Sequence, residues 1–207
     1  SLHHLNMNMN KPDVEDLYEL SPMQQGMLFH CLRDSDNKGL YVIQMSYALH
    51  GSLNVPAFER AWRMVFSRHA VLRTFFSWQD LAKPLQIVVR EVELPLEHHD
   101  WRELCAAEQQ PRLAAFLKAE HSRGFDFAEP PLTRLALIRT GDNFYRFVWT
   151  FHHILFEGWS TAVILKELCA FYQAFSTDKS IELEQPRPYR DYIIWQQQQE
   201  ISGAEAY

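Results

Sequence analysis

The chain has 207 residues, of which 47% are hydrophobic and 14% aromatic, so it can bury a core as one large domain or two small ones and is not disordered throughout. The net charge is −6 at pH 7, and the 20 lysines and arginines are scattered, which opposes nucleic-acid binding because phosphate contacts need a dense basic surface. The apolar runs are too short to span a bilayer, so no membrane partner is expected.

The start of the chain is polar and lacks the apolar segment of a signal peptide. We expect residues 1–15 to be a flexible leader or a cloning remnant, residues 16–200 to be the folded part, and residues 201–207 to be a tail. The cysteines, Cys31, Cys105 and Cys169, are far apart and odd in number, which disfavours a disulfide framework or a zinc knuckle. A reducing cytoplasm fits this cysteine usage.

The first helix is predicted from Ser21 and Pro22, because Ser is a favoured N-cap and Pro a favoured first helical residue. Met23 and Met27 are four residues apart in this helix, so we expect both on the face that packs against the core. His98 and His99 lie among charges in LPLEHHDW and are expected at the surface.

The later elements alternate between β-forming runs and helical periodicity. The expected strands are residues 41–50, 72–78, 85–89, 94–98, 132–138 and the aromatic run that starts at 144; the expected helices are residues 54–67, 111–123, 160–175 and 189–200. Pro111 is placed at the start of its helix and Gly124 just after its end. Residues 141–143 predict the turn of a hairpin that pairs the last two strands.

The stretch FYRFVWTFHHILFEGWS, residues 144–160, is the best candidate for a site. Its aromatic run predicts a buried strand, on which His152 and His153 would face opposite sides. One imidazole can then face a substrate while the other is held inside by hydrogen bonds. The helix expected after Gly158 would expose unpaired N–H groups that favour negative charge.

Three alternatives compete with catalysis at this stretch. The histidines could form a packed polar pair without a chemical role. His153 and Glu157 are four residues apart and could share a helix face as metal ligands do, but no third ligand is evident nearby, so no metal is expected. A covalent nucleophile is not supported, because no cysteine and no Gly-x-Ser-x-Gly serine lies near the pair.

HHILFEGWS resembles the HHxxxDG motif of condensation domains in nonribosomal peptide synthetases, which belong to the same superfamily as chloramphenicol acetyltransferase. Other motifs of that family occur in the right order: LSPMQQGMLFH at residues 20–30, RHAVLRTFF at 68–76, FDFAEPPLTRLALIR at 125–139 and YRDYIIWQ at 189–196. The similarity covers residues 16–200, which would then be the N-terminal subdomain of a condensation domain.

The resemblance implies an α/β (α+β) fold, a chloramphenicol acetyltransferase-like sandwich of a mixed sheet with flanking helices. This sandwich would be one lobe of a V-shaped, two-lobed domain. The implied activity is that of an amide-forming acyltransferase, in which the amine of an aminoacyl thioester attacks the thioester carbonyl of an acyl or peptidyl donor. Donor and acceptor peptidyl carrier proteins would present these substrates on 4′-phosphopantetheine arms, and the domain itself would bind no cofactor. The other expected partners are the second lobe and a following adenylation domain.

The resemblance also assigns roles to residues. His153 would orient the amine or take its proton, and the N–H of Gly158 would stabilise the oxyanion. His152 and Glu157 would be structural, with Glu157 standing where the family motif has Asp and pairing with an Arg. Arg68 and Arg73 of the second motif would be scaffold cations. The residues expected along the substrate tunnel are Met23, Met27, Trp159 and Ser160.

Two other functions are kept as alternatives. The chain could be a noncatalytic docking module for carrier proteins, if Glu157 or the lack of a second lobe abolishes turnover. It could also be a coenzyme A-dependent acyltransferase, which the opening and fourth motifs disfavour. An isolated first lobe is expected to be inactive alone.

Overall fold

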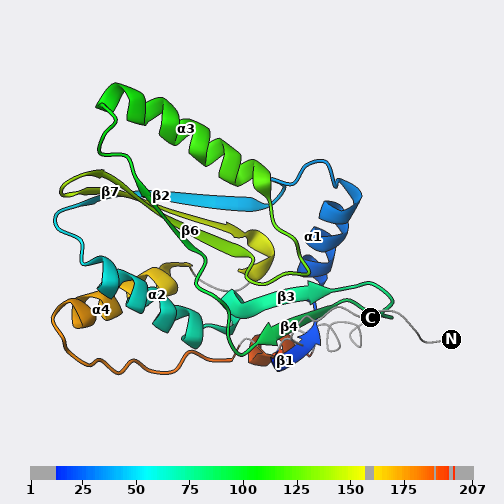
Figure 1. Cartoon of the computed structure of the whole chain (residues 1–207). Coiled ribbons are helices and arrows are strands. Elements are labelled where there is room, and N and C mark those ends of the chain that lie inside the picture. The colour runs from blue at the N-terminus through cyan, green and yellow to red at the C-terminus, as the bar shows by residue number, and fades with distance from the viewer. Residues whose placement is uncertain (1–12, 157–160, 189, 196–197, 199–207) are drawn as a thin grey trace, which may run out of the picture.

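The computed structural model describes residues 13–156, 161–188, 190–195 and 198, and these residues form two β-sheets with helices around them (Figure 1). The strands are β1 (Val14–Glu19), β2 (Val42–His50), β3 (Thr74–Ser77), β4 (Leu85–Val89), β5 (Leu96–Asp100), β6 (Thr133–Gly141) and β7 (Phe144–His152). The α-helices are α1 (Pro22–Arg33), α2 (Val55–Arg68), α3 (Ala106–Arg123) and α4 (Thr161–Ser176), and two short 3-10 helices are η1 (Ala70–Arg73) and η2 (His153–Leu155).

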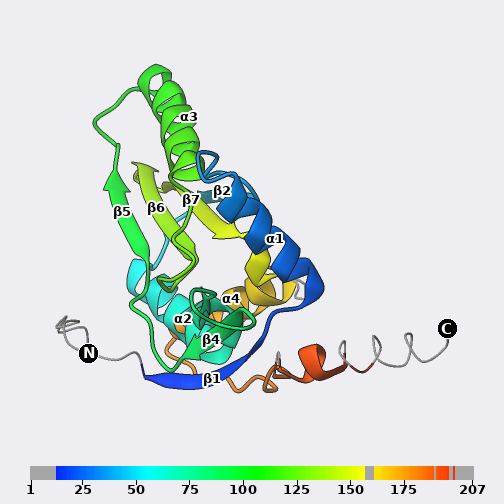
Figure 2. The same ribbon diagram turned by 90° about the vertical axis from the view of Figure 1, so that its right-hand side faces the viewer.

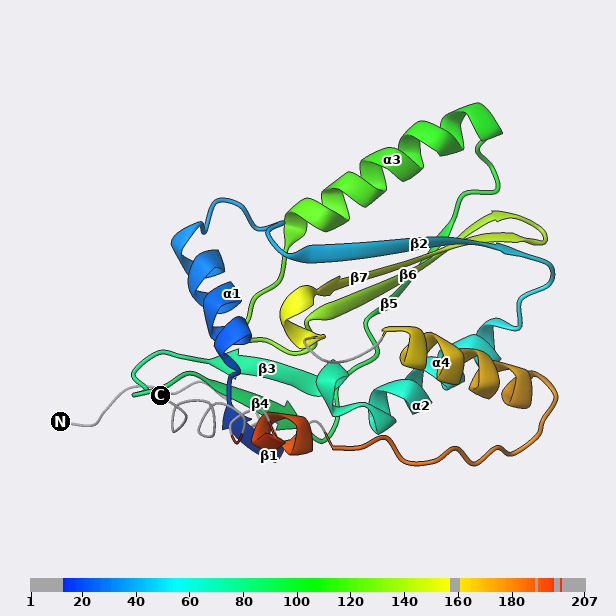
Figure 3. The same ribbon diagram turned by 180° about the vertical axis from the view of Figure 1, so that it is seen from behind.

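The larger sheet has four strands in the order β2–β7–β6–β5, and the smaller one has three in the order β1–β4–β3. In the larger sheet β2, β7 and β6 are antiparallel, whereas β5 is parallel to β6. Helix α3 lies over one face of this sheet and α2 with α4 lie against the other (Figures 1 and 3). The expected α/β class, a mixed sheet with flanking helices, is confirmed.

The main core lies between the four-stranded sheet, α2 and α4. Trp62 of α2 is at its centre, with its ring centroid 5.4 Å from that of Trp149 and 5.7 Å from that of Phe147 on β7. Side-chain alternation puts Val148 on the opposite face, in a small second cluster beneath α3. Strand β7 is therefore buried on both faces, as its continuous apolar run predicts.

The two predicted helix starts in the first half of the chain are confirmed. The Ser21 hydroxyl accepts the Gln24 N–H at 3.1 Å, and the Gln24 side chain accepts the Ser21 N–H at 3.0 Å, which completes a capping box at α1. At α2 the Asn54 side chain accepts the Ala57 N–H at 3.0 Å. These bonds satisfy N–H groups that the first helical turn leaves without a backbone partner.

The predicted start of the helix at Pro111 is wrong. Helix α3 begins at Ala106, and Pro111 lies inside it. The carboxylate of Glu108 accepts the Cys105 N–H at 2.9 Å in a capping box, which fixes the earlier start. Pro111 removes one N–H donor from the helical ladder, and the helix continues to its predicted end at Gly124.

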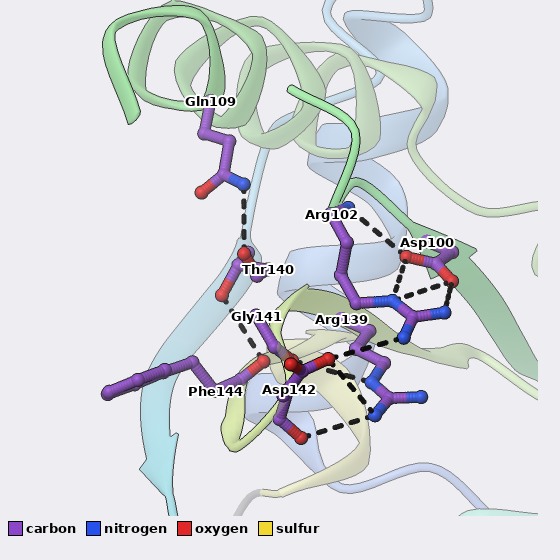
Figure 4. Close-up of polar contacts among 8 residues, drawn as sticks. All are labelled: Asp100, Arg102, Gln109, Arg139, Thr140, Gly141, Asp142 and Phe144. Atoms are coloured by element: carbon purple, nitrogen blue, oxygen red, sulfur yellow. Dashed lines mark hydrogen bonds and ion pairs between the residues drawn. The ribbon is translucent and has the colours of Figure 1, made fainter. Parts of the chain in front are cut away.

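A polar network ties α3 to the hairpin turn of β6 and β7 (Figure 4). Gln109 donates from its side chain to the carbonyl of Thr140 at 2.9 Å. Arg102 binds Asp100 at 2.7 Å and reaches Asp142 at 3.4 Å, and its hydrogen bonds lower the pKa of Asp100 to about 2. These side chains join three segments at the end of the sheet opposite the histidine pair.

The first strand was not expected. Residues 14 and 15, predicted to be in the leader, belong to β1, which pairs antiparallel with β4. Acidic side chains in VEDLYE hide the strand pattern, and one of them, Glu15, binds the Arg73 guanidinium at 2.6 Å. Strand pairing and a long-range ion pair therefore decide this element, and local sequence does not show either.

Other boundaries are shifted by a few residues. Residues 72 and 73 lie in η1 rather than in β3, and β5 starts at Leu96 rather than at 94. His98 is exposed as expected and binds Glu59 at 2.8 Å. His99 is only half-exposed, because its ring packs edge-on against Phe116 of α3 at 5.3 Å between centroids. In the predicted C-terminal helix, residues 190–195 are helical.

Replacing Trp62 should be the most damaging change in the core. Trp62→Ala removes a fully buried indole between α2 and β7 and should lower the free energy of unfolding by about 3–5 kcal/mol. Chemical denaturation would measure this loss. The control is Arg63→Ala on the exposed side of the same helix, which should change stability by less than about 0.5 kcal/mol. Equal losses for the two variants would contradict the described core.

Candidate active site

Strand β7 carries the histidine pair to one end of the sheet, next to α1 (Figure 2). It lies between β2 and β6, and pairs Val42 with His152 and Thr133 with Phe151 at this end. His152 is the last residue of the strand, and His153 is the first residue of η2. The alternation of faces expected for the stretch therefore holds along the strand, but His153 lies just beyond it.

His152 is buried, with 1% of its surface exposed. Its Nδ1 accepts the Ile154 N–H at 3.2 Å, so the proton is on Nε2, which donates to the carbonyl of Leu40 at 3.1 Å. Burial lowers the pKa of His152 to about 4, although the bond to Leu40 opposes the shift. The ring is thus neutral near pH 7 and is held on both sides, a geometry that suits the structural role expected for it.

His153 is in a different environment, with a partly exposed side chain. Its backbone N–H donates to the carbonyl of Tyr41 at 2.9 Å, which fixes the backbone position from which the His153 side chain projects. Its ring atom Nδ1 is buried and has no hydrogen-bond partner among the described residues. Nε2 is therefore the ring nitrogen that a substrate could reach.

Two buried glutamines lie next to η2: Gln24 contacts it directly, and Gln86 is hydrogen-bonded to Gln24. Neither was predicted to have a role. Gln24 of α1 donates from Nε2 to the carbonyl of Ile154 at 3.0 Å. Its amide also exchanges hydrogen bonds with Gln86 of β4, at 3.0 and 3.3 Å. These contacts join α1, the three-stranded sheet and η2. The signal in the sequence was the capping position of Gln24, which indicates a helix start and not this second contact.

Comparison with known proteins identifies the family of the chain. The profile of the family described as Condensation domain matches residues 14–207. This chain belongs to the condensation-domain family. It is 35% identical over 206 residues to bacitracin synthase 3 of Bacillus licheniformis, covering 100% of this chain and 3% of that protein. It is 35% identical over 198 residues to tyrocidine synthase 2 of Brevibacillus parabrevis, covering 96% of this chain and 6% of that protein.

A solved structure has the same fold. The starter condensation domain of rhizomide synthetase RzmA matches with a TM-score of 0.81 and 20% identity, over 93% of this chain and 48% of that one. The condensation-domain chain described here thus spans about half of that structure and a few per cent of the curated relatives above.

The two methionines expected in the core and along the tunnel differ in burial. Met27 is buried with 7% of its surface exposed, as expected, but Met23 is 56% exposed, so its predicted core position is wrong. The buried face of α1 consists of Gln24, Met27 and Leu28, and it is centred away from Met23. The hydrogen bonds of Gln24 allow a polar residue to take the inward position. The tunnel roles stay predictions.

The arginines of the second motif, expected to be scaffold cations, contact other elements of the fold. Arg68 binds Glu167 of α4 with two hydrogen bonds, at 3.0 and 3.1 Å, and donates to the carbonyl of Glu184 at 2.6 Å. His69 contacts the same carboxylate at 2.8 Å. Arg73 binds Glu15 and the backbone carbonyls of Phe66, Val89, Arg90 and Ser67. In the described part of the chain, neither arginine contacts His152 or His153.

Four of the predicted site residues lie outside the described residues: Glu157, Gly158, Trp159 and Ser160. The oxyanion contact of Gly158 and the Arg pairing of Glu157 therefore stay predictions. Both arginines of the second motif already have a carboxylate partner in Glu167 and Glu15.

A cavity of about 660 Å³ opens on the His152 side of the strand end, lined by the end of α1, the segment after it and residues 123–127 and 129–131. Cys31 borders it, with its sulfur 3.7 Å from His152 Nε2. Burial raises the pKa of the Cys31 thiol to about 11, so it is protonated near neutral pH and is a poor nucleophile.

Within the described ranges, no cluster of three metal-binding side chains forms, and no helix is long and apolar enough to cross a membrane.

The burial of His152 predicts a pH dependence of stability. Its pKa is about 4 when folded, against about 6.5 for an unfolded histidine, so the unfolded chain binds more protons between these values. The free energy of unfolding should therefore fall as the pH drops from 7 toward 4, by roughly 2–3 kcal/mol from this group.

Urea denaturation at several pH values would measure this slope in wild type and in His152→Asn. The variant should be less stable at pH 7, and its free energy of unfolding should depend less steeply on pH. Burial also lowers the pKa of His69, which accounts for some of the pH dependence that remains. His98→Asn, at an exposed position, should keep the wild-type slope. An unchanged slope in His152→Asn would show that the imidazole is not held neutral.

Proposed function

We propose that this chain supplies the histidine-bearing part of a condensation site that forms an amide bond. The amine of a carrier-bound aminoacyl acceptor attacks the thioester carbonyl of a carrier-bound acyl or peptidyl donor. A C–N bond forms, the C–S bond breaks, and the amine proton ends on the departing thiol. The observation that carries this proposal is the placement of His153, at a fixed strand end, in a chain of the condensation-domain family.

The two histidines divide the work in this proposal. His152 is buried and uses both ring nitrogens in contacts with its surroundings, so it cannot take the amine proton. His153 is partly exposed, and its Nε2 is proposed to accept the proton or orient the amine. The N–H of Gly158 is proposed to bind the oxyanion of the tetrahedral intermediate, which carries the negative charge.

The proposed partners follow from the family. Donor and acceptor peptidyl carrier proteins present their substrates on 4′-phosphopantetheine arms, and an adenylation domain loads the acceptor. Relatives of the chain include synthases of bacitracin and tyrocidine, so peptide antibiotics are the proposed class of product. A docking module without turnover is the alternative outcome of the tests below.

The central test is His153→Ala in the synthetase that carries this chain. Dipeptide formation should fall by a factor of about a hundred, the usual scale for loss of a positioned acid or base, while the melting temperature stays close to that of wild type. Mass spectrometry of carrier-bound products gives the rate, and His98→Ala is the matched exposed control. Normal carrier binding with no dipeptide from the wild type would favour the docking module instead.

A second test asks whether these 207 residues suffice for catalysis. The chain spans 48% of the RzmA starter domain, and we propose that the remaining half encloses the site and excludes water, which strengthens the oxyanion contact. The purified chain should therefore fold but make no detectable dipeptide from two loaded carriers. Adding the second half of a condensation domain in trans should restore some product. Dipeptide formation by the chain alone at the rate of an intact domain would contradict this.

A further inference from the structure

The turn that precedes β2 has an unusual residue at its tip. Gly39 to Val42 form a four-residue turn closed by the Val42 N–H and the Gly39 carbonyl at 3.1 Å. Tyr41, the third residue, has a φ of 57°, in the left-handed region. Turns place Gly or Asn at such a position, because a side chain there brings Cβ against the carbonyl oxygen. A bulky residue is disfavoured there, so Tyr41 needs a specific reason.

The strained turn presents two consecutive carbonyls to the two consecutive histidines. The carbonyl of Leu40 accepts the Nε2–H of His152 at 3.1 Å, and the carbonyl of Tyr41 accepts the backbone N–H of His153 at 2.9 Å. The turn lies beside the end of β7, between α1 and β2 (Figure 3). One local backbone conformation therefore fixes both the ring orientation of buried His152 and the backbone direction at partly exposed His153.

The side chain of Tyr41 connects this turn to α1. Its hydroxyl lies 2.9 Å from Nδ1 of His30. Its half-buried ring stands edge-on to the rings of His30 and His152, at 5.7 and 6.3 Å between centroids. Gly or Asn would relax the backbone at this position, but neither could make these contacts.

We propose that Tyr41 is a positioning residue for the histidine pair. Its hydroxyl anchors the turn to His30 of α1, and the anchored turn holds its two carbonyls toward His152 and His153. The link to catalysis rests on the proposed function of His153, whereas the anchoring itself does not. Tyr41 touches no reacting atom in this scheme and acts only through the position of His153.

Hydrogen exchange tests the anchoring without any activity measurement. In Tyr41→Phe the ring is kept and only the hydroxyl is lost, so the turn should open more often. The His153 amide should then exchange about five- to tenfold faster, the factor expected for one net hydrogen bond. The matched control is Tyr47→Phe on β2, whose hydroxyl contacts only the Met45 sulfur among the described residues. This control should leave the exchange of the His153 amide unchanged.

A second pair of variants separates the anchor from general destabilisation. His30→Phe should raise His153 exchange by the same factor as Tyr41→Phe, and the double variant should add little, because both remove one bond. Amides that exchange by local openings in which the Tyr41–His30 contact stays intact should exchange as in wild type. Unchanged His153 exchange in Tyr41→Phe, or equal acceleration at those amides, would overturn the proposal.

Kinetics in the synthetase that carries the chain complete the test. Tyr41→Phe should lower kcat for dipeptide formation about three- to tenfold with the acceptor KM unchanged, because misplacing His153 affects the reaction step and not binding. A faster His153 exchange with unchanged kcat would show that the anchor exists but that His153 is not the reacting histidine. That outcome overturns the link to catalysis, and His153→Ala then decides independently whether the proposed function also fails.

Discussion

The site depends on β7, a strand of the larger sheet whose side chains are buried on both faces. Trp149 faces α2 and α4, and Val148 faces α3, and both are almost fully buried. A strand packed on both sides cannot shift by one residue without exchanging its two faces, so its register with β2 and β6 is strongly specified. The position of the strand end, and of the histidines there, therefore follows from core packing.

Core packing alone would leave polar groups at this strand end without partners, and that would cost stability. Groups from distant segments bind them: the carbonyls of Leu40 and Tyr41 and the side-chain amide of Gln24. Each contact also fixes the orientation of the group that it binds. His152 is held neutral because charging it would need water that its surroundings exclude. The same contacts that satisfy the backbone thus hold His152 inside and leave the ring of His153 able to meet a substrate.

Features of the fold that depend on local patterns could be predicted from the sequence. The aromatic run predicted β7, the turn at residues 141–143 predicted the hairpin, and the Ser21 cap and the apolar periodicity of residues 54–67 predicted two helices. The misses share a cause, which is contact between distant residues. The capping contact of Glu108 sets the start of α3 five residues before Pro111, and pairing with β4 makes the acidic segment β1 a strand. No local pattern shows that Gln24 would point inward or that Tyr41 would occupy a left-handed turn position.

The arginines of the second motif act at a distance from the histidines, yet they bear on the same site. Arg68 fastens α2 to α4 through Glu167, and its contact with the Glu184 carbonyl adds the segment that follows α4. This ion pair is largely shielded from water, so removing one partner would leave a costly unpaired charge. Helix α4 starts at Thr161, and the chain before it comes from η2, which Gln24 holds. The two elements that flank residues 157–160 are therefore each tied to the scaffold by polar contacts, as the oxyanion donor proposed at Gly158 would require.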